Sequence, residues 1–284
     1  MTWALAAVVG LVVAAAALRA WGAWRWQAAT AELLAQLEGA RQPVAPARFD
    51  AAELDGLPAP VQRYLRAALR DGAPVVAAVT VEHRGTFNTS ERGEQWAPFT
   101  STQRVVTRRP GFVWDARVAM VPGVPVYVHD AYIAGTGILH PSLGGVYALA
   151  NLRDTRDVAL GELMRYLAEA AWYPTALLPS QGVRWQALDE RSARATLADG
   201  DLALTLTFTF RADDGLIESV RADARGRTVG ARVEQAPWEG RWSDYAERDG
   251  MVVPLAGEVA WLLPEGRQPY WRGTITALRY EFAE

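Results

Sequence analysis

An unbroken apolar run occupies the N-terminus, from Thr2 to Leu18. Its length lies at the short end of the range that crosses a bilayer as a helix, about 17–25 residues. Tryptophans lie at both ends of the run, as in the aromatic belts of membrane proteins: Trp3, Trp21, Trp24 and Trp26. We therefore predict a single-pass transmembrane anchor with its flank over residues 1–26, in the inner (cytoplasmic) membrane.

Two alternatives to an anchor stay open. A cleaved signal peptide needs a positively charged segment before the apolar run, and only the amino terminus precedes this one. A buried helix of a soluble protein is less favoured, because Arg19 and Arg25 follow the run as membrane flanks do. By the positive-inside rule these arginines place the following domain in the cytoplasm, but the sequence leaves the side of the membrane open.

Residues 27–49 continue as a partly polar helical stalk and a proline-containing linker, followed by a single β-rich domain over residues 50–284. At its start, residues 60–72 carry apolar side chains at helical spacing, which predicts an amphipathic helix. From Val75 the pattern changes to short runs rich in Val, Thr and aromatic residues, bounded by Gly or Pro. These runs predict about ten or more strands, joined mostly by short turns and therefore antiparallel.

Alternation is clearest from Leu202 to Phe210, where every second residue is Leu or Phe. A long antiparallel sheet with one apolar face must curl or be covered. The segment from Gly161 to Leu178 is the obvious cover, since it reads as a helix of about four turns, closed by Tyr173–Pro174, with an aliphatic face. We predict a mainly β (α+β) fold: a large curved antiparallel sheet, a half-barrel or open barrel, with this central helix in its concave face and the transmembrane helix before it.

The opposite face of the predicted central helix carries charged and aromatic side chains: Glu162, Arg165, Tyr166, Glu169, Trp172 and Tyr173. Glu162 and Glu169 are roughly 10 Å apart along a helix axis, which exceeds the carboxylate separation in glycoside hydrolases. An intrahelical ion network through Arg165 is favoured over a catalytic pair. A polar patch that contacts a ligand is the alternative.

The composition removes several kinds of chemistry. The net charge of −3 argues against a general nucleic-acid-binding protein. All 29 basic residues are arginine, so there is no lysine for a Schiff base or a P-loop. The chain has no cysteine and only three histidines, at no metal-ligand spacing. His129 and Asp130 are neighbours on a predicted strand and face opposite ways. We predict no catalytic residues, no metal and no cofactor.

Aromatic residues give a more diffuse signal. Each one taken singly is most often part of a core, but together with the aromatic helix face they also suit the walls of a cavity for an apolar or amphiphilic ligand. Both interpretations stay open. Those on or beside predicted strands are Trp114, Trp185, Trp238, Trp242, Trp261, Tyr270 and Trp271.

Longer motifs extend from Leu57 to the C-terminus: LPAPVQRYL, PGFVWDA, HDAYIAGTG, GELMRYLAEAAWYPTALLP, PWEGRWSDY and YWRGTITALRYEF. They resemble an uncharacterised family of bacterial and archaeal proteins, a domain of unknown function that often follows an N-terminal membrane segment. This resemblance implies no activity. The arrangement of a helix in a curved sheet is also loosely similar to the half-barrel of the LolA/LolB lipoprotein carriers, which would place the domain outside the cytoplasm.

The favoured function is a membrane-anchored binding or carrier protein for a hydrophobic or amphiphilic, lipid-like ligand held between helix and sheet. One alternative is a hydrolase-type enzyme that uses Asp130, Glu162 or Glu169 as acid or base. Another is an interaction module displayed on the membrane. The expected partners are the membrane and an apolar ligand, and not nucleic acid. The predicted ligand-binding residues are Trp114, Asp130, Tyr132, Glu162, Arg165, Tyr166, Glu169, Trp172, Tyr173 and Trp261.

Overall fold

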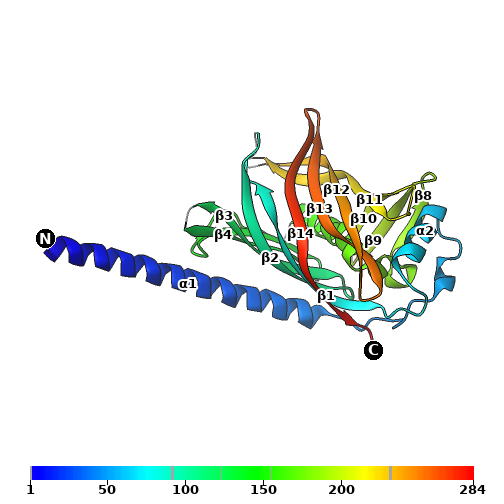
Figure 1. Cartoon of the computed structure of the whole chain (residues 1–284), viewed down its shortest axis with the longest axis horizontal. Helices are drawn as coiled ribbons and strands as arrows, with labels where there is room; N and C mark the ends of the chain where they lie inside the picture. Colours follow the sequence, from blue (N-terminus) through cyan, green and yellow to red (C-terminus); the bar gives the residue numbers. More distant parts are fainter. Residues whose placement is uncertain (1, 91–92, 122, 154, 230–231) are drawn as a thin grey trace.

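The computed structural model describes residues 2–90, 93–121, 123–153, 155–229 and 232–284. Within these residues all strands belong to one antiparallel sheet with the order β6-β5-β4-β3-β2-β1-β14-β13-β12-β11-β10-β9-β8, and β7 pairs with β5. The predicted curved sheet, central helix and N-terminal apolar helix are confirmed (Figure 1).

The first half of the sheet is a meander of six strands, and a seventh short strand also pairs with the fifth. These strands are β1 (Val76–Asn88), β2 (Trp96–Val106), β3 (Gly111–Val121), β4 (Val124–Ile133), β5 (Thr136–Leu143), β6 (Tyr147–Ala148) and β7 (Leu152–Arg153). The second half is also a meander: β8 (Arg184–Ala187), β9 (Ser192–Asp199), β10 (Leu202–Phe210), β11 (Ile217–Val229), β12 (Arg232–Arg248), β13 (Met251–Leu263) and β14 (Gly266–Phe282). Pairing of β1 with β14 joins the two halves. The end of the first half and the start of the second are therefore the two edges of the sheet.

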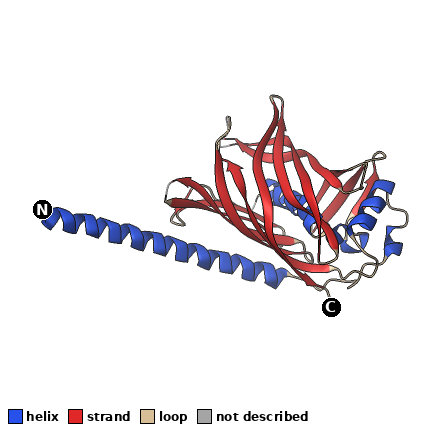
Figure 2. Cartoon of the chain, in the orientation of Figure 1, coloured by secondary structure: helices blue, strands red, loops and turns tan. Residues whose placement is uncertain are grey.

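The helical segments are α1 (Thr2–Ala40), η1 (Ala51–Leu54), α2 (Ala59–Ala68), α3 (Arg156–Glu169), η2 (Ala170–Trp172), η3 (Pro174–Leu177) and η4 (Pro179–Gln181). Figure 2 shows the short helices inside the curve of the sheet or at its end, and α1 extending away from the domain. In α2 the predicted apolar stripe, including Val61, Tyr64 and Leu65, is buried. Alternation in β10 is likewise confirmed, since Leu202, Leu204 and the other even-numbered positions are buried.

The chain between the two sheet edges explains why a helix lies in the concave face. It must travel from β7 to β8, and α3 makes the crossing inside the curve. At its start, the Arg156 guanidinium donates to the backbone of Asp201 near β10, and Ala159 lies against Gly137 of β5. Just beyond its end, the backbone oxygen of Trp172 accepts a hydrogen bond from Tyr280 of β14 at 2.7 Å. The segment thus runs from both edges to the central strands.

The helix differs in extent from the predicted Gly161–Leu178. It begins at Arg156, because the Thr155 side chain caps it by accepting from the Val158 N–H at 3.3 Å. It ends at Glu169, and the following residues form three short 3₁₀ turns, two of which begin with proline. Proline has no backbone N–H and cannot continue an α-helix. The long predicted helix is therefore an α-helix followed by a chain of tight turns.

The predicted stalk does not stand free of the domain. Helix α1 is continuous from Thr2 to Ala40, and its second half packs on the convex face of the sheet through Trp26, Leu33 and Leu37. The Trp26 indole donates to Asp115 at 2.8 Å. A Cβ on Gly22 would lie 2.2 Å from the Gly144 carbonyl oxygen, so the backbones of α1 and the β5–β6 turn approach each other closely at this point.

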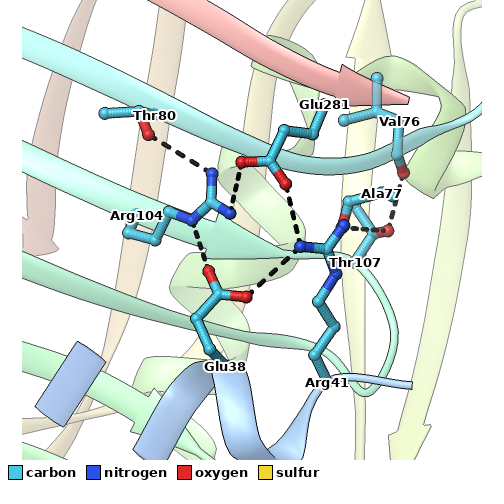
Figure 3. Close-up of polar contacts among 8 residues, drawn as sticks. All are labelled: Glu38, Arg41, Val76, Ala77, Thr80, Arg104, Thr107 and Glu281. Atoms are coloured by element: carbon cyan, nitrogen blue, oxygen red, sulfur yellow. Dashed lines mark hydrogen bonds and ion pairs between the residues drawn. The ribbon is translucent and has the colours of Figure 1, made fainter. Parts of the chain in front are cut away.

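Ion pairs fix the end of α1 to the sheet (Figure 3). Glu38 of α1 and Arg41, which directly follows the helix, meet Arg104 of β2 and Glu281 of β14 in a ring of four charges. The N–O distances are 2.8 Å for Arg104–Glu38, 2.7 Å for Arg104–Glu281 and 2.9 Å for Arg41–Glu281. Because these charges lie at the surface, the ring mainly fixes geometry and contributes little stability.

Candidate functional site: a cavity beside the central helix

A cavity of about 700 Å³ lies between α3 and the concave face of the sheet. Its volume falls in the range of small-molecule sites, roughly 300–1,000 Å³. The lining extends from α3 to the ends of the β1–β2, β3–β4 and β13–β14 hairpins, where Gly93 and Met120 are exposed. We call this open end the mouth. The aromatic lining residues are Phe87, Trp114, Trp172, Trp238, Trp242, Trp261, Tyr270 and Trp271.

At the inner end, the Arg165 guanidinium makes a network of ion pairs and hydrogen bonds. Its Nε donates to Glu169 at 2.7 Å and its Nη1 to Asp130 at 2.5 Å. Its Nη2 donates to Gln103 at 2.9 Å, and the Gln103 amide donates to Glu169 at 2.6 Å. The guanidinium also stacks 4.9 Å from the ring centre of Trp114. Three of the five N–H donors of this buried arginine are thereby used within the network.

Glu162 lies one helical turn from Arg165 but does not pair with it. The predicted ion triplet is therefore half formed: Arg165 binds Glu169 as predicted, and Asp130 of β4 takes the place of Glu162. Burial raises the pKa of Glu162 well above its ordinary value, and the Asp130 charge raises it further. Among the described residues, the Glu162 Oε2 and Asp130 Oδ1 atoms have no hydrogen-bond partner. Both atoms lie beside the cavity, and the two carboxyl groups are close enough that a proton shared between them also raises the pKa of Glu162.

A β-bulge in β11 aims two further arginines into the cavity. Ala222 pairs with Trp238, but the next pair is Arg225 with Ala236, so one extra residue is inserted on β11. A bulge of this kind changes which face the following side chains point to. Arg225 and Arg227 consequently line the cavity, with the Arg225 guanidinium 5.0 Å from the Trp238 ring centre.

The rear wall behind Trp172 contains the buried imidazole of His83. The two rings are 4.9 Å apart, and the Ser101 hydroxyl lies 3.3 Å from the imidazole Nδ1. Burial lowers the pKa of His83 to about 3, and the Arg165 charge lowers it further. The histidine is therefore neutral at physiological pH and adds no charge to the wall.

The structure brings seven of the ten predicted ligand-binding residues to the cavity: Trp114, Asp130, Glu162, Arg165, Glu169, Trp172 and Trp261. Contact of these seven with a ligand stays a prediction.

Tyr132, Tyr166 and Tyr173 are buried away from the cavity. Their hydroxyls donate to Asp199 at 2.7 Å, to the Thr107 carbonyl at 3.4 Å and to the Tyr166 carbonyl at 2.7 Å. A buried tyrosine needs such a partner, and these three find theirs in the filled base of the domain.

The sequence reasoning missed Gln103, Arg225 and Arg227 as cavity residues. Gln103 sits on a strand with ordinary alternation and carries no motif. The arginines are placed by a bulge, and the sequence signal that could have indicated it is the isolated Gly226 within the strand. His129 and Asp130 do face opposite sides, since His129 packs against Trp26 with ring centres 3.7 Å apart. Across the described parts of the chain, His, Asp and Glu form no cluster of three that would hold a metal ion.

Comparison with known proteins defines the family. The profile of a family of unknown function, DUF6920, matches residues 55–280. The chain belongs to this family. The match confirms the resemblance that the sequence motifs indicated.

No curated protein matches the chain. Among solved structures, a LolA superfamily protein from Nitrosomonas europaea aligns with a TM-score of 0.33 and 8% identity, covering 78% of this chain and 92% of that one. A β-barrel-like protein of the DUF1849 family from Brucella abortus aligns with a TM-score of 0.21 and 11% identity, covering 73% and 99%.

Proposed function

We propose that the protein is a membrane-anchored binding or carrier protein, which holds a hydrophobic or amphiphilic, lipid-like molecule between α3 and the concave sheet. The observation that carries the proposal is the cavity of about 700 Å³ with aromatic and aliphatic walls. Each methylene that moves from water into such a cavity contributes about 0.8 kcal/mol. An acyl chain of ten carbons would therefore gain about 8 kcal/mol before the cost of immobilising it.

The polar inner end supports an amphiphile over a pure hydrocarbon. A hydrocarbon would leave the free oxygens of Asp130 and Glu162 buried without partners, which costs free energy. A ligand with a polar group at one end would satisfy them while its chain extends along the tryptophan walls. The interior of the domain is not tightly filled, so the interaction-module alternative is not favoured.

The position of α1 supports attachment to a membrane on the side of the mouth. The apolar part of α1 is fully exposed, and the helix is long and apolar enough to cross a bilayer. Where it leaves the domain, Arg19 donates to the Gly123 carbonyl in the β3–β4 turn. Figure 1 shows α1 continuing past β3 and β4 in the direction of that turn. Exposed apolar side chains gather near the same end: Met120, Val124, Tyr147 and Leu149.

This geometry suggests how a ligand would exchange. A bilayer spanned by residues 2–18 would lie beside the apolar rim of the mouth. An apolar molecule would then pass between bilayer and cavity with little exposure to water, which is the costly step for such a molecule. The open end of the sheet, in this arrangement, is the side that faces the lipid.

Native mass spectrometry of the full chain, released from detergent micelles, tests the proposal. We expect bound apolar molecules, either co-purified or added as hexadecanol. Val128 lines the cavity and Val128→Trp should reduce the bound fraction strongly, because the indole fills the space. Ala203 is exposed on the outer face of β10, and Ala203→Trp is the matched control. A protein that is empty under all conditions, or equal occupancy in both variants, would refute the proposal.

A second candidate function rests on Glu162. Asp130 and Glu169 are held by Arg165, but Glu162 is free of ion pairs, borders the cavity and has a raised pKa. Such a carboxyl group is suited to act as a general acid, so a hydrolase-type enzyme is the alternative. Conversion of a bound ester by the wild type, and its loss in Glu162→Gln with binding retained, would favour this alternative.

A further inference from the structure

We propose that the ligand is an anionic amphiphile whose carboxylate or phosphate group binds the Arg225 guanidinium inside the cavity. This inference rests on the proposed binding function and adds the chemical class of the ligand. It depends on the charges that face the cavity and on which of them already have partners.

Most charged groups of the inner cavity neutralise one another. Arg165 holds both Asp130 and Glu169. Nearer the mouth, Arg267 is held by Glu239 and Glu258. Each of these two arginines is therefore already held by two carboxylates, so neither is free to bind the anionic group of a ligand.

Arg225 and Arg227 differ from the other cavity arginines. Within the described part of the chain neither forms an ion pair or a side-chain hydrogen bond with another residue, and their contacts are the faces of Trp238 and Trp261. Arg225 is 9% exposed. A buried guanidinium that stacks on an aromatic ring keeps its five donors free. Carboxylate and phosphate groups are the acceptors that match this fork in shape and charge.

Glu162 does not cancel the Arg225 charge. The raised pKa of Glu162, caused first by burial and then by the Asp130 charge, favours its neutral form although Arg225 acts in the opposite direction. A protonated carboxyl group is also a hydrogen-bond donor. A ligand anion at this end would therefore find the Arg225 fork and a carboxylic acid, with the second arginine, Arg227, towards the mouth. The remaining acid of the lining, Glu94, is exposed at the rim.

The local structure is built around this arginine. The bulge in β11 turns Arg225 inwards, and Gly161 of α3 lies over its guanidinium. A Cβ at Gly161 would lie 3.7 Å from the Arg225 Nε. The side chain is thus enclosed between Gly161 of α3 and Trp238 of β12, with its polar edge towards the cavity.

A competition assay on the immobilised full chain in neutral detergent at pH 8.5 tests the inference, with tritiated hexadecanol as the neutral probe. The competitors share one chain length: hexadecanol, palmitate, hexadecyl phosphate and hexadecylamine. We expect palmitate or hexadecyl phosphate to compete at concentrations about tenfold lower than hexadecanol, since a hydrogen bond to a charged group is worth about one decade in affinity or more. The two anions distinguish a carboxylate from a phosphate ligand.

Arg225→Met should reduce this anion preference to about one, and Arg225→Lys should retain part of it. Arg221→Met on the same strand is the matched control, because Arg221 points to solvent on the outer face and should leave the tenfold preference unchanged. The wild-type preference itself decides the inference if Arg225→Met does not fold. Equal competition by all four molecules, or strongest competition by hexadecylamine, would overturn the anionic ligand and leave the binding function standing. Absence of probe binding would overturn both.

Discussion

Replacing Arg165 by methionine is the sharpest test of how the inner end of the cavity is held together. Methionine keeps most of the aliphatic length and the contact with the Trp114 ring but removes the charge and all donors. Asp130 and Glu169 would lose their counter-charge, and their side chains are only 14% and 10% exposed. Gln103 would also lose the donor to its amide oxygen.

The expected cost follows from the burial of these carboxylates. Removing one partner of a buried ion pair typically destabilises a protein by about 3–5 kcal/mol, because an uncompensated charge stays inside. For a domain of this size, each kcal/mol lowers the melting temperature by roughly 2–4 °C. We therefore expect Arg165→Met to melt about 6–20 °C below the wild type, measured by near-ultraviolet circular dichroism in detergent.

Two further variants separate lost charge balance from lost packing. Arg221→Met removes an exposed arginine, 50% accessible, and should change stability by less than about 1 kcal/mol. The triple variant Arg165→Met, Asp130→Asn, Glu169→Gln removes all three charges and should recover much of the loss, since neutral replacements of buried ion pairs are often tolerated. If Arg165→Met melts within 2 °C of the wild type, or the triple variant is no better than the single one, the network is not what holds this end.

Two other predictions concern Glu162 and Gly22. The pKa of Glu162 is raised in the native state, so the unfolded chain releases this proton at lower pH, and Glu162 lowers stability progressively as the pH rises above about 4.5 towards the native pKa. Glu162→Gln should therefore be more stable than the wild type at pH 8 but not at pH 4, measured by chemical denaturation. An equal difference at both pH values would contradict this. Gly22→Leu should lift α1 from the sheet, because its side chain would overlap the Gly144 carbonyl oxygen; faster hydrogen exchange over Trp26–Leu37 is expected, and unchanged exchange would contradict the close packing.

The sheet was predictable from sequence because strand alternation is local. Leu202 to Phe210 alternates in the chain and is buried in the same alternation in the structure. The apolar stripe of α2 was predictable for the same reason, because apolar residues recur there at the helical period of about 3.6 residues. Where apolar residues recur at the period of a strand or a helix, a single sequence is enough to assign both the element and its buried face.

The extent of α3 was not predictable in the same way. Pro174 and Pro179 exclude a continuous α-helix, but Ala170 and Ala171 are helix-forming residues, and their sequence gives no reason for the helix to end at Glu169. Tyr166 and Tyr173 share a helix-like face with Glu169 in the sequence, but the chain leaves the α-helix at Ala170 and Tyr173 no longer follows that face. Tyr166 lies within α3 and is buried in the base of the domain. The hydroxyls then bond to backbone carbonyls and not to a ligand.

The arginines of the cavity show a further reason. Even-numbered residues of β11 such as Val220 and Ala222 face inwards, and strict alternation would place Arg225 and Arg227 on the outer face. The bulge inserts one residue into β11, so odd-numbered residues after it face inwards. Since a shift of one residue exchanges the two faces of a strand, a local irregularity decides which charges enter the cavity, and pattern reasoning on the sequence assigns them to solvent.

The cavity itself follows from the topology. Because the two edges of the sheet are the end of one meander and the start of the next, the chain must cross the interior once. The crossing element is one helix, about 10 Å across, whereas β12 and β14 have 17 residues each, or about 58 Å when extended. A single crossing near the base covers only part of that length. The part of the sheet nearer the mouth therefore has apolar side chains on its concave face that no helix covers. The charged face of α3 forms the inner end of the resulting cavity. A space with aromatic walls and a charged inner end suits the proposed amphiphilic ligand, so the functional argument depends more on the position of α3 than on any motif.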